Sequence, residues 1–397
     1  MSVRTAVVLA AGEGTRLRPL TRNRPKPMLP AANRPILEHV LDALVDAGVR
    51  QLVLVVGYRR DRVQEYFGPS YRDVPIEYAV QDKQLGSGHA LLQARDAIEG
   101  SCVVVNGDRL IEAGSVRDVV DAFETDDVPA ALAVIERPSV RHYGAVVLRD
   151  RDIDQIVEKP DTDEYRLINA GIYAFDAAIF EAIDETSRAD GELGLTDTIA
   201  ELVDRERVRG VRTEGLWVDA TYPWDLLEVA AEVLARGRVP QQETDGAVWV
   251  DPAATVHDDA VLQGPVAVGP DSEIGPGAVV GPIVAVGRNG TVGANATVQR
   301  TVLDADTRVA AGSTLVDAVL GQTVHLGPGT TVPGGPADVR VDTEVFEEQP
   351  LGAVIADRTT AAGDVSFEPG ALVGPNVEIH AGAHVPGRVA GGAEVVR

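Results

Sequence analysis

An aliphatic residue recurs at every sixth position in the second half of the chain, and this period restricts the fold more than any other feature of the sequence. The run holds without a break at Val250, Val256, Leu262, Val268, Ile274, Val280, Val286, Val292 and Val298. Glycine and proline are interspersed between these positions. Such a period predicts one flat face per repeat and three faces per coil of a parallel β-helix, whose sides stack into a continuous core.

The repeat is disturbed further along the chain. It loses phase after Val298 and resumes at Val309, Leu315, Leu320, Leu326 and Val332. Residues 337–360 break it, and a last block restores it at Phe367, Val373, Ile379 and Val385. We interpret residues 337–360 as a hairpin or a return strand, which lets the last block cap the prism or pack beside it.

Short apolar runs alternate with helical patterns in the first half of the chain. Strands are expected at 5–10, 51–56, 76–80, 102–106 and 130–135, and helices at 35–47, 61–66, 89–98 and 115–123. This alternation predicts an α/β domain, Rossmann-like, with a mixed, mainly parallel sheet covered by helices on both faces. Because a helical pattern over 221–236 stops before a polar stretch, we expect a first domain at 1–236, a linker at 237–246 and a β-helix domain at 247–397.

A glycine-rich loop follows the first expected strand. Gly12 and Gly14 let the backbone turn and approach a ligand closely, and the N–H groups of such a loop can bind an anion. Arg16 and Lys26 add the cations that a triphosphate needs. The loop has neither the Gly-Lys-Ser/Thr of a P-loop nor the third glycine of a dinucleotide fingerprint. We therefore interpret it as another kind of nucleotide site, the alternative being a turn with solvated arginines.

The charge of the chain excludes some partners. A formal net charge of −25, from 36 basic and 61 acidic residues, opposes binding to nucleic acid or to an anionic membrane. The only lysines are Lys26, Lys83 and Lys159. Such a balance is typical of proteins from a very saline cytoplasm, and it makes each lysine a site candidate, although Lys83 fits a surface residue equally well. No apolar run reaches the length of a membrane span and no signal-peptide pattern is present, so we expect a cytoplasmic protein.

The N-terminal motifs are similar to a known signature. G-x-G-T-R-L-x-P-L-T followed by P-K-P-M-L-P resembles the signature of the sugar-1-phosphate nucleotidylyltransferases. This resemblance implies an enzyme that converts a nucleoside triphosphate and a hexose-1-phosphate into a nucleotide sugar and pyrophosphate with Mg²⁺. It implies that Arg16 and Lys26 are catalytic residues on the leaving pyrophosphate. The nucleotide-binding residues implied in this loop are Leu9, Ala10, Ala11, Gly12, Gly14 and Thr15.

Two aspartates are the metal-ligand candidates. Asp108 ends an apolar strand and matches the Gly-Asp motif of the family, whose aspartate holds magnesium. Mg²⁺ usually takes one or two carboxylates together with phosphates and water, so a second acid is expected. Asp219 lies in a segment similar to W-x-D-x-G-T-P-x-D-L, although Thr221 replaces the glycine of that pattern and Tyr222 the threonine.

Two further stretches match the family's substrate motifs. Residues 81–90 are close to the Q-x-x-Q-L-G-T-x-H-A stretch of the uridyl-transferring enzymes, which implies that Gln81 and Gly86 read uracil and that Ser87 lies beside the nucleotide. UTP is therefore the expected substrate, with dTTP second. His89 is given no role. The resemblance also implies a sugar-phosphate site built from Gly144, Glu158, Lys159 and Asn169.

The second half of the chain resembles the archaeal enzymes that join this activity to an amino-sugar-phosphate acetyltransferase. That resemblance implies a left-handed β-helix. However, Ala311 stands at the position of the family's catalytic histidine, and acidic residues at 347–348 replace a common basic pair. We expect acetylation to be lost, and we expect His325 to be structural.

We conclude from the sequence that the chain is a sugar-1-phosphate nucleotidylyltransferase acting on glucose-1-phosphate or N-acetylglucosamine-1-phosphate. Two alternatives remain: a bifunctional uridyltransferase and acetyltransferase, and a nucleotide-binding assembly or regulatory module. Because prismatic β-helices often associate side by side, a homo-oligomer, either trimer or dimer, is expected.

Overall fold

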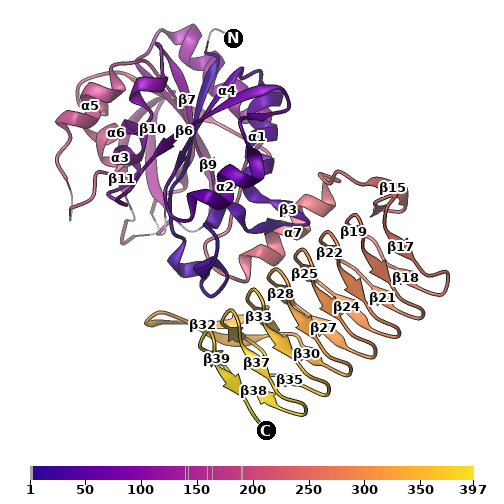
Figure 1. Cartoon of the computed structure of the whole chain (residues 1–397). Coiled ribbons are helices and arrows are strands. Elements are labelled where there is room, and N and C mark those ends of the chain that lie inside the picture. Colours follow the sequence, from indigo (N-terminus) through magenta and orange to yellow (C-terminus); the bar gives the residue numbers. More distant parts are fainter. Residues whose placement is uncertain (1–2, 139, 142, 159, 163, 189–190) are drawn as a thin grey trace. The chain divides into compact units, whose positions relative to one another are not determined.

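The computed structural model describes residues 3–138, 140–141, 143–158, 160–162, 164–188 and 191–397. These residues group by contacts into two compact units (Figure 1). Unit 1 takes in the described residues of Met1–Glu13, Pro25–Met28 and Ile36–Val218, and unit 2 takes in Gly14–Arg24, Leu29–Pro35 and Asp219–Arg397. None of the helices in the described part of the chain combines the length and apolar character that a bilayer crossing requires.

Unit 1 is built on one mixed sheet. Its strands, in spatial order, are β10 (Gly144–Arg149), β11 (Asp152–Glu158), β13 (Val208–Arg212), β9 (Ala130–Glu136), β12 (Leu167–Phe175), β7 (Cys102–Asn106), β1 (Thr5–Ala10), β4 (Gln51–Val56), β6 (Val74–Val80) and β5 (Ser70–Tyr71). β7, β1, β4 and β6 are mutually parallel, as expected. The other half makes the sheet mixed: β13 runs parallel to β9, whereas β12 runs antiparallel to both β7 and β9, and β10 to β11. Fully buried apolar strands do not indicate their direction, and the short β10–β11 connection permits only antiparallel pairing.

Helices cover both faces of this sheet. They are α1 (Ile36–Ala47), α2 (Arg60–Phe67), α3 (Ser87–Leu92), α4 (Ala113–Asp126), α5 (Ile179–Glu185) and α6 (Leu195–Val203). Unit 1 also contains the 3₁₀ turns η3 (Lys26–Met28) and η4 (Arg95–Ala97) and the short strand β8 (Arg109–Leu110). Along β1, Ala6 and Val8 face the core beneath α1 and α4, whereas Val7 faces the core beneath α3, α5 and α6. Both faces are thus dry, which explains why the strands are apolar runs without alternation.

Unit 2 contains a parallel β-helix with three sheets. One consists of β16 (Val248–Val250), β19 (Val266–Val268), β22 (Val284–Val286), β25 (Thr301–Leu303), β28 (Ala318–Leu320), β33 (Ala353–Ile355), β36 (Ala371–Val373) and β39 (Arg388–Val389), with β15 (Gln242–Asp245) antiparallel at its start. The second consists of β17 (Thr255–Val256), β20 (Glu273–Ile274), β23 (Thr291–Val292), β26 (Arg308–Val309), β29 (His325–Leu326), β34 (Thr360–Ala361), β37 (Glu378–Ile379) and β40 (Glu394–Val395). The third consists of β18 (Val261–Leu262), β21 (Val279–Val280), β24 (Thr297–Gln299), β27 (Thr314–Val316), β30 (Thr331–Pro333), β35 (Ser366–Phe367) and β38 (His384–Val385).

The six-residue period is the core of this β-helix. From Val268 to Val298 the repeat positions are fully buried, and they form one cluster. The loss of phase after Val298 has a simple cause. Val268 pairs with Val286, eighteen positions on, but Val286 pairs with Leu303, seventeen positions on. The next coil, from Leu303 to Leu320, is also seventeen residues long, and the stacking continues through both shorter coils.

The interruption is a β-hairpin, one of the two expected alternatives. It is formed by β31 (Ala337–Val341) and β32 (Glu344–Gln349). β33 already stacks on β28, so the coil resumes at Ala353 rather than after residue 360.

Segments that precede the β-helix in sequence also belong to unit 2. They are the residues Gly14–Arg24, called the signature loop below, with η1 (Thr15–Leu17) and η2 (Leu20–Arg22), the strands β2 (Pro30–Ala31) and β3 (Arg34–Pro35), and, after β14 (Val218–Asp219), the helix α7 (Asp225–Ala235). α7 packs on β25 and β28. The domain boundaries expected from the sequence, at 236 and 247, remain a prediction about folding domains.

Candidate active site

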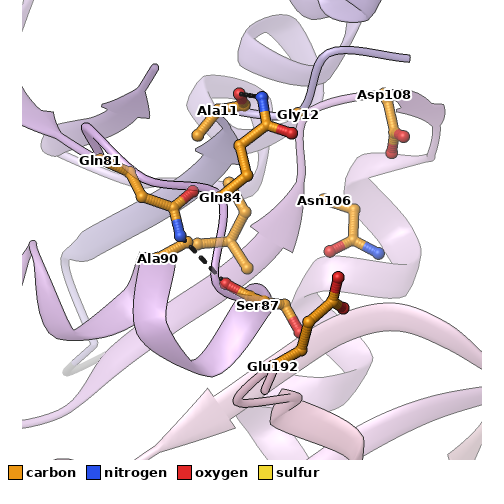
Figure 2. Close-up of a pocket in the computed structure, with 11 residues that line it drawn as sticks. Ala11, Gly12, Gln81, Gln84, Ser87, Ala90, Asn106, Asp108 and Glu192 are labelled. Atoms are coloured by element: carbon orange, nitrogen blue, oxygen red, sulfur yellow. Dashed lines mark hydrogen bonds between the residues drawn. The ribbon is translucent and has the colours of Figure 1, made fainter. Parts of the chain in front are cut away.

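A pocket of about 310 Å³ opens in unit 1 where β1, β6 and β7 end (Figure 2). Its lining consists of Leu9, Ala11, Gly12, Gln81, Gln84, Gly86, Ser87, Ala90, Asn106, Asp108 and Glu192. In Figure 2, Asn106 and Asp108 lie on one side, with Gln81, Gln84 and Ala90 on the other. The pocket therefore brings together residues predicted for the nucleotide and one predicted for the metal. Ala10 is buried in β1.

Gln81 follows β6 and is only 4% exposed. Its side-chain Nε2 donates to the carbonyl oxygen of Gly86 at 3.1 Å and lies 2.9 Å from Nδ1 of His89. These contacts fix which way the amide points, which a residue that reads a base edge requires. His89, which was expected to have no role, thus orients Gln81. Burial, and then the positive charge of Arg188, lower the pKa of His89, which favours the neutral ring.

The loop from Gln81 to α3 is held by residues that are distant in sequence. Gly86 adopts φ +99°, and a Cβ there would lie 2.3 Å from the carbonyl oxygen of Leu193, so only glycine fits. The Ser87 hydroxyl accepts a hydrogen bond from the backbone N–H of Leu195 at 2.9 Å. The same segment carries Glu192 to the pocket. No sequence motif pointed to Glu192, because its place depends on this long-range packing.

Asp108 and Lys26 meet at the end of β7. Lys26 Nζ lies 2.6 Å from Asp108 Oδ2, with 13% and 29% of the two side chains exposed. Lys26 sits in η3, which packs on α1. Asn106 and Gln84 also line the pocket, although sequence reasoning gave them no role. The sequence offered only weak signals for a role in the pocket: Asn106 is a carboxamide at the end of a strand, and Gln84 is the second glutamine of the motif at 81–90.

The structure brings together three of the four residues predicted for the sugar phosphate. Gly144 pairs with Glu158 across β10 and β11. A Cβ at Gly144 would lie 3.3 Å from Glu158 Oε2 and 3.6 Å from the Cβ of Asn169. Asn169 donates to the Tyr173 hydroxyl at 2.8 Å and accepts from the backbone N–H of Gly171 at 3.0 Å. The fourth, Lys159, lies outside the described residues.

An aromatic cluster with arginines lies in the same unit. The guanidinium of Arg109 lies 5.8 Å from the ring centre of Tyr143 and 5.3 Å from that of Trp217, and the guanidinium of Arg137 is 4.9 Å from Trp217. Trp217 donates to the carbonyl oxygen of Ala170, next to Asn169. Sequence reasoning missed Arg109, which directly follows Asp108.

The predicted phosphate loop continues into unit 2. Gly14 adopts φ +68°, and its carbonyl accepts hydrogen bonds from the Thr21 hydroxyl at 2.8 Å and from the backbone N–H of Leu17 at 3.0 Å. Thr15 and Arg16 are exposed, whereas Leu17 is buried. The loop thus presents Arg16 from a fixed backbone turn.

Asp219 lies in a hydrogen-bonded turn of unit 2. Its Oδ2 accepts from the Thr221 hydroxyl at 3.2 Å. Asp225 accepts from the backbone N–H groups of Thr221 at 2.8 Å and Tyr222 at 2.7 Å. Burial raises the pKa of Asp225 to about 6, against the lowering effect of these two hydrogen bonds. Thr221 therefore links the two carboxyl groups of this turn, since it donates to both Asp219 and Asp225.

Both positions considered for acetyl transfer are exposed. Ala311 is exposed in the turn between β26 and β27, and His325 is exposed in β29. No group of three or more metal-ligating side chains gathers among the residues for which side chains are described.

Two protein families match the chain. The nucleotidyl transferase family matches residues 5–236, and the family described as GMPPB C-terminal domain matches residues 262–351. The two matches together extend over most of both units.

Individual proteins also match the chain. The bifunctional protein GlmU of Methanocaldococcus jannaschii is 33% identical over 95% of this chain and 93% of its own length. The UTP–glucose-1-phosphate uridylyltransferase AglF of Haloferax volcanii is 38% identical over 55% of this chain and 92% of its own length. A solved UDP-glucose pyrophosphorylase in complex with UDP-glucose shares the fold, with a TM-score of 0.55 and 23% identity over 59% of this chain and 99% of that one.

Proposed function

We propose that this chain, which belongs to the nucleotidyl transferase family and is a sugar-1-phosphate nucleotidylyltransferase, uses UTP, with dTTP second, and glucose-1-phosphate or N-acetylglucosamine-1-phosphate. The observation that carries this proposal is the pocket of unit 1, which combines the Gln81 wall, the Gly12 loop and Asp108. The similarity to AglF, a UTP–glucose-1-phosphate uridylyltransferase, supports the choice of uridylyl transfer.

The reaction is a substitution at phosphorus. A phosphate oxygen of the sugar phosphate attacks the α-phosphorus, the bond to the bridging oxygen breaks, and pyrophosphate leaves with that oxygen and its electron pair. The nucleophile is already anionic, so positioning and charge neutralisation matter more than a base. Arg16 and Lys26 neutralise the leaving pyrophosphate, and the backbone N–H groups around Gly12, Gly14 and Thr15 hold the phosphates.

Base and sugar are held by separate groups. Gln81 and Gly86 bind the base edge, with Ser87 beside the nucleotide. Glu158 and Asn169 bind sugar hydroxyls next to Gly144. The nitrogen and the oxygen of the Asn169 amide each make one hydrogen bond inside the protein, and each can make a second one, to a sugar hydroxyl. Lys159 seats the sugar phosphate, a role that rests on its sequence motif.

We infer that a magnesium ion is bound by Asp108 and Asp219, the two carboxylates that the sequence motifs predict. Asp108 offers a partly exposed carboxylate in the pocket wall, and Asp219 offers the second. Mg²⁺ usually takes one or two carboxylates and completes its shell with phosphates and water. When bound, Mg²⁺ supplies positive charge to the α-phosphate.

The β-helix has a different part in the proposal. We infer that its coil is left-handed, that it supports a homo-oligomer, and that acetyl transfer has been lost with the residue replaced by Ala311. The alternative of a purely nucleotide-binding assembly module is disfavoured, because the nucleotidyl transferase family matches residues 5–236 and GlmU matches nearly the whole chain.

The first test is the Lys26→Ala variant. Pyrophosphate release is measured for the common nucleoside triphosphates against several hexose-1-phosphates in high salt, and the wild type should be most active with UTP. Loss of the ammonium should lower kcat by roughly 10²–10³-fold, as for other groups that stabilise developing charge.

Lys83→Ala is the matched control, because Lys83 is exposed and is not among the pocket-lining residues. It should retain activity within about twofold, as expected of a substitution at the surface. A folded Lys26→Ala protein with activity near that of the wild type would contradict the proposal.

A further inference from the structure

Arg24, at the end of the signature loop, enters the surface of the β-helix. Its guanidinium pairs through Nη1 with Asp304 and through Nη2 with Asp357 Oδ1, the latter at 2.5 Å. The Arg24 side chain is only 5% exposed, and that of Asp357 6%. Burial lowers the pKa of Arg24, but the two carboxylates outweigh this effect and raise it above its ordinary value. The arginine is therefore charged and paired with two carboxylates through Nη1 and Nη2, while its buried Nε has no hydrogen-bond partner among the described residues.

The two acids come from coils that are not adjacent. Asp304 follows β25 and Asp357 follows β33, with β28 between these strands (Figure 1). Their carboxylates are held in place by backbone N–H groups, Asp304 by Ala305 at 2.7 Å and Asp357 by Gln322 at 3.0 Å. A Cβ at Gly321 would lie 2.3 Å from Asp357 Oδ1, so glycine there leaves room for the carboxylate. Three consecutive coils thus form the receptor for one arginine.

The loop on the other side of this contact is compact. Leu17, Leu20 and Thr21 are fully buried. The Thr21 hydroxyl closes the turn onto Gly14, as described above. Because the loop is closed upon itself, a single contact at Arg24 can fix the whole segment that carries Arg16. The helix α7, which follows the turn of Asp219, packs on two of the same three coils.

A buried ion pair is weak evidence for stability, since desolvation cancels much of the attraction. Such a pair does fix geometry, because a guanidinium held by two carboxylates has a single well-defined placement.

We propose that Arg24 is a positioning residue for nucleotidyl transfer, through which three coils of the β-helix hold the signature loop and with it Arg16. The inference rests on the proposed function. It makes the β-helix a part of the transferase machinery and not only an assembly domain.

The test compares Arg24→Gln with Arg300→Gln in the full chain. Arg300 also joins two coils, with Nε and Nη2 at 2.5 Å and 2.7 Å from the carboxylate of Asp317, but neither residue belongs to the signature loop. Arg24→Gln should lower kcat by about tenfold or more, as expected when a charge-stabilising group is misplaced, while KM for the sugar phosphate stays within about twofold. Amide hydrogen exchange over residues 14–24 should become faster. Arg300→Gln should change none of these quantities.

Two results overturn the proposal: a folded Arg24→Gln protein with unchanged kcat and loop exchange, or an equal loss of kcat in Arg300→Gln. If Arg24→Gln does not fold, Asp304→Asn, which leaves the Asp357 contact, should lower kcat and speed loop exchange, and an unchanged result overturns the proposal. If the wild type releases no pyrophosphate, the proposed function fails by itself. Loop exchange in Arg24→Gln then decides the structural part, and unchanged protection overturns it.

Discussion

His89 shows how one residue outside every assigned role can control a binding group. The Nδ1 of a neutral imidazole can accept the hydrogen bond from Gln81 Nε2, whereas a protonated ring cannot. The lowered pKa of His89 keeps the ring neutral at neutral pH. Acidification through this pKa adds the proton and removes the contact, so base recognition should weaken toward low pH and be intact above the ordinary histidine value of 6.5.

We therefore expect KM for UTP to rise as the pH falls from about 8 to 5.5. His89→Ala should raise KM for UTP about fivefold near neutral pH, the value of one neutral hydrogen bond, with little change in kcat. The variant should also lose the part of the acid dependence that is due to His89, while the titration of UTP itself remains in both proteins. Identical KM profiles for the two proteins would refute the role given to His89.

The hairpin β31–β32 is the element that departs most from the six-residue repeat. Its packing explains why Tyr222 replaces the threonine of the family pattern. Phe346 of β32 lies 4.5 Å from the ring centre of Tyr222 and 5.2 Å from that of Trp224, and these two rings stack at 4.9 Å. Tyr222 stands where the family pattern has threonine. The larger ring provides the surface on which the hairpin packs, next to the turn of Asp219.

Phe346→Ala should release the hairpin and loosen that turn. Aromatic pairs of this kind contribute about 0.5–1.5 kcal/mol beyond area burial, so we expect kcat to fall about two- to tenfold and the tryptophan emission to shift. The neighbouring Val345, which is 47% exposed, gives the control variant Val345→Ala. Equal behaviour of the two variants would rule out a role for the Phe346 contact.

At the scale of the whole molecule, the chain matches the bifunctional protein GlmU over 95% of its length, but we propose nucleotidyl transfer as its only reaction. We expect no CoA release from acetyl-CoA and glucosamine-1-phosphate under conditions in which the full chain releases pyrophosphate. The physical reason is that Ala311 cannot remove a proton from the attacking amine. Measurable CoA release would instead support the bifunctional alternative, and His325→Ala would then show whether His325 has taken over the base function.

Local patterns were sufficient for much of this protein. The six-residue period requires stacked coils because each repeat can bury its aliphatic residue only against its neighbours, and β4 and β7 begin and end where the apolar runs do. The motif residues of the pocket could be named because a phosphate-binding turn requires glycines and charged residues within a few consecutive positions. Strand direction in the second half of the sheet could not be predicted, since a buried strand is apolar in either direction.

Only the tertiary structure decided which distant residues meet. Glu192 reaches the pocket through the packing of Leu193 on Gly86, and His89 gains its role from the position of the Gln81 amide. Arg24 meets two acids that lie 280 and 333 positions further along the chain. The sequence determined the repeat and the motifs because both depend on neighbours along the chain. The ion pairs and ring contacts between coils and loops depend on chain closure over long separations, which no local pattern encodes.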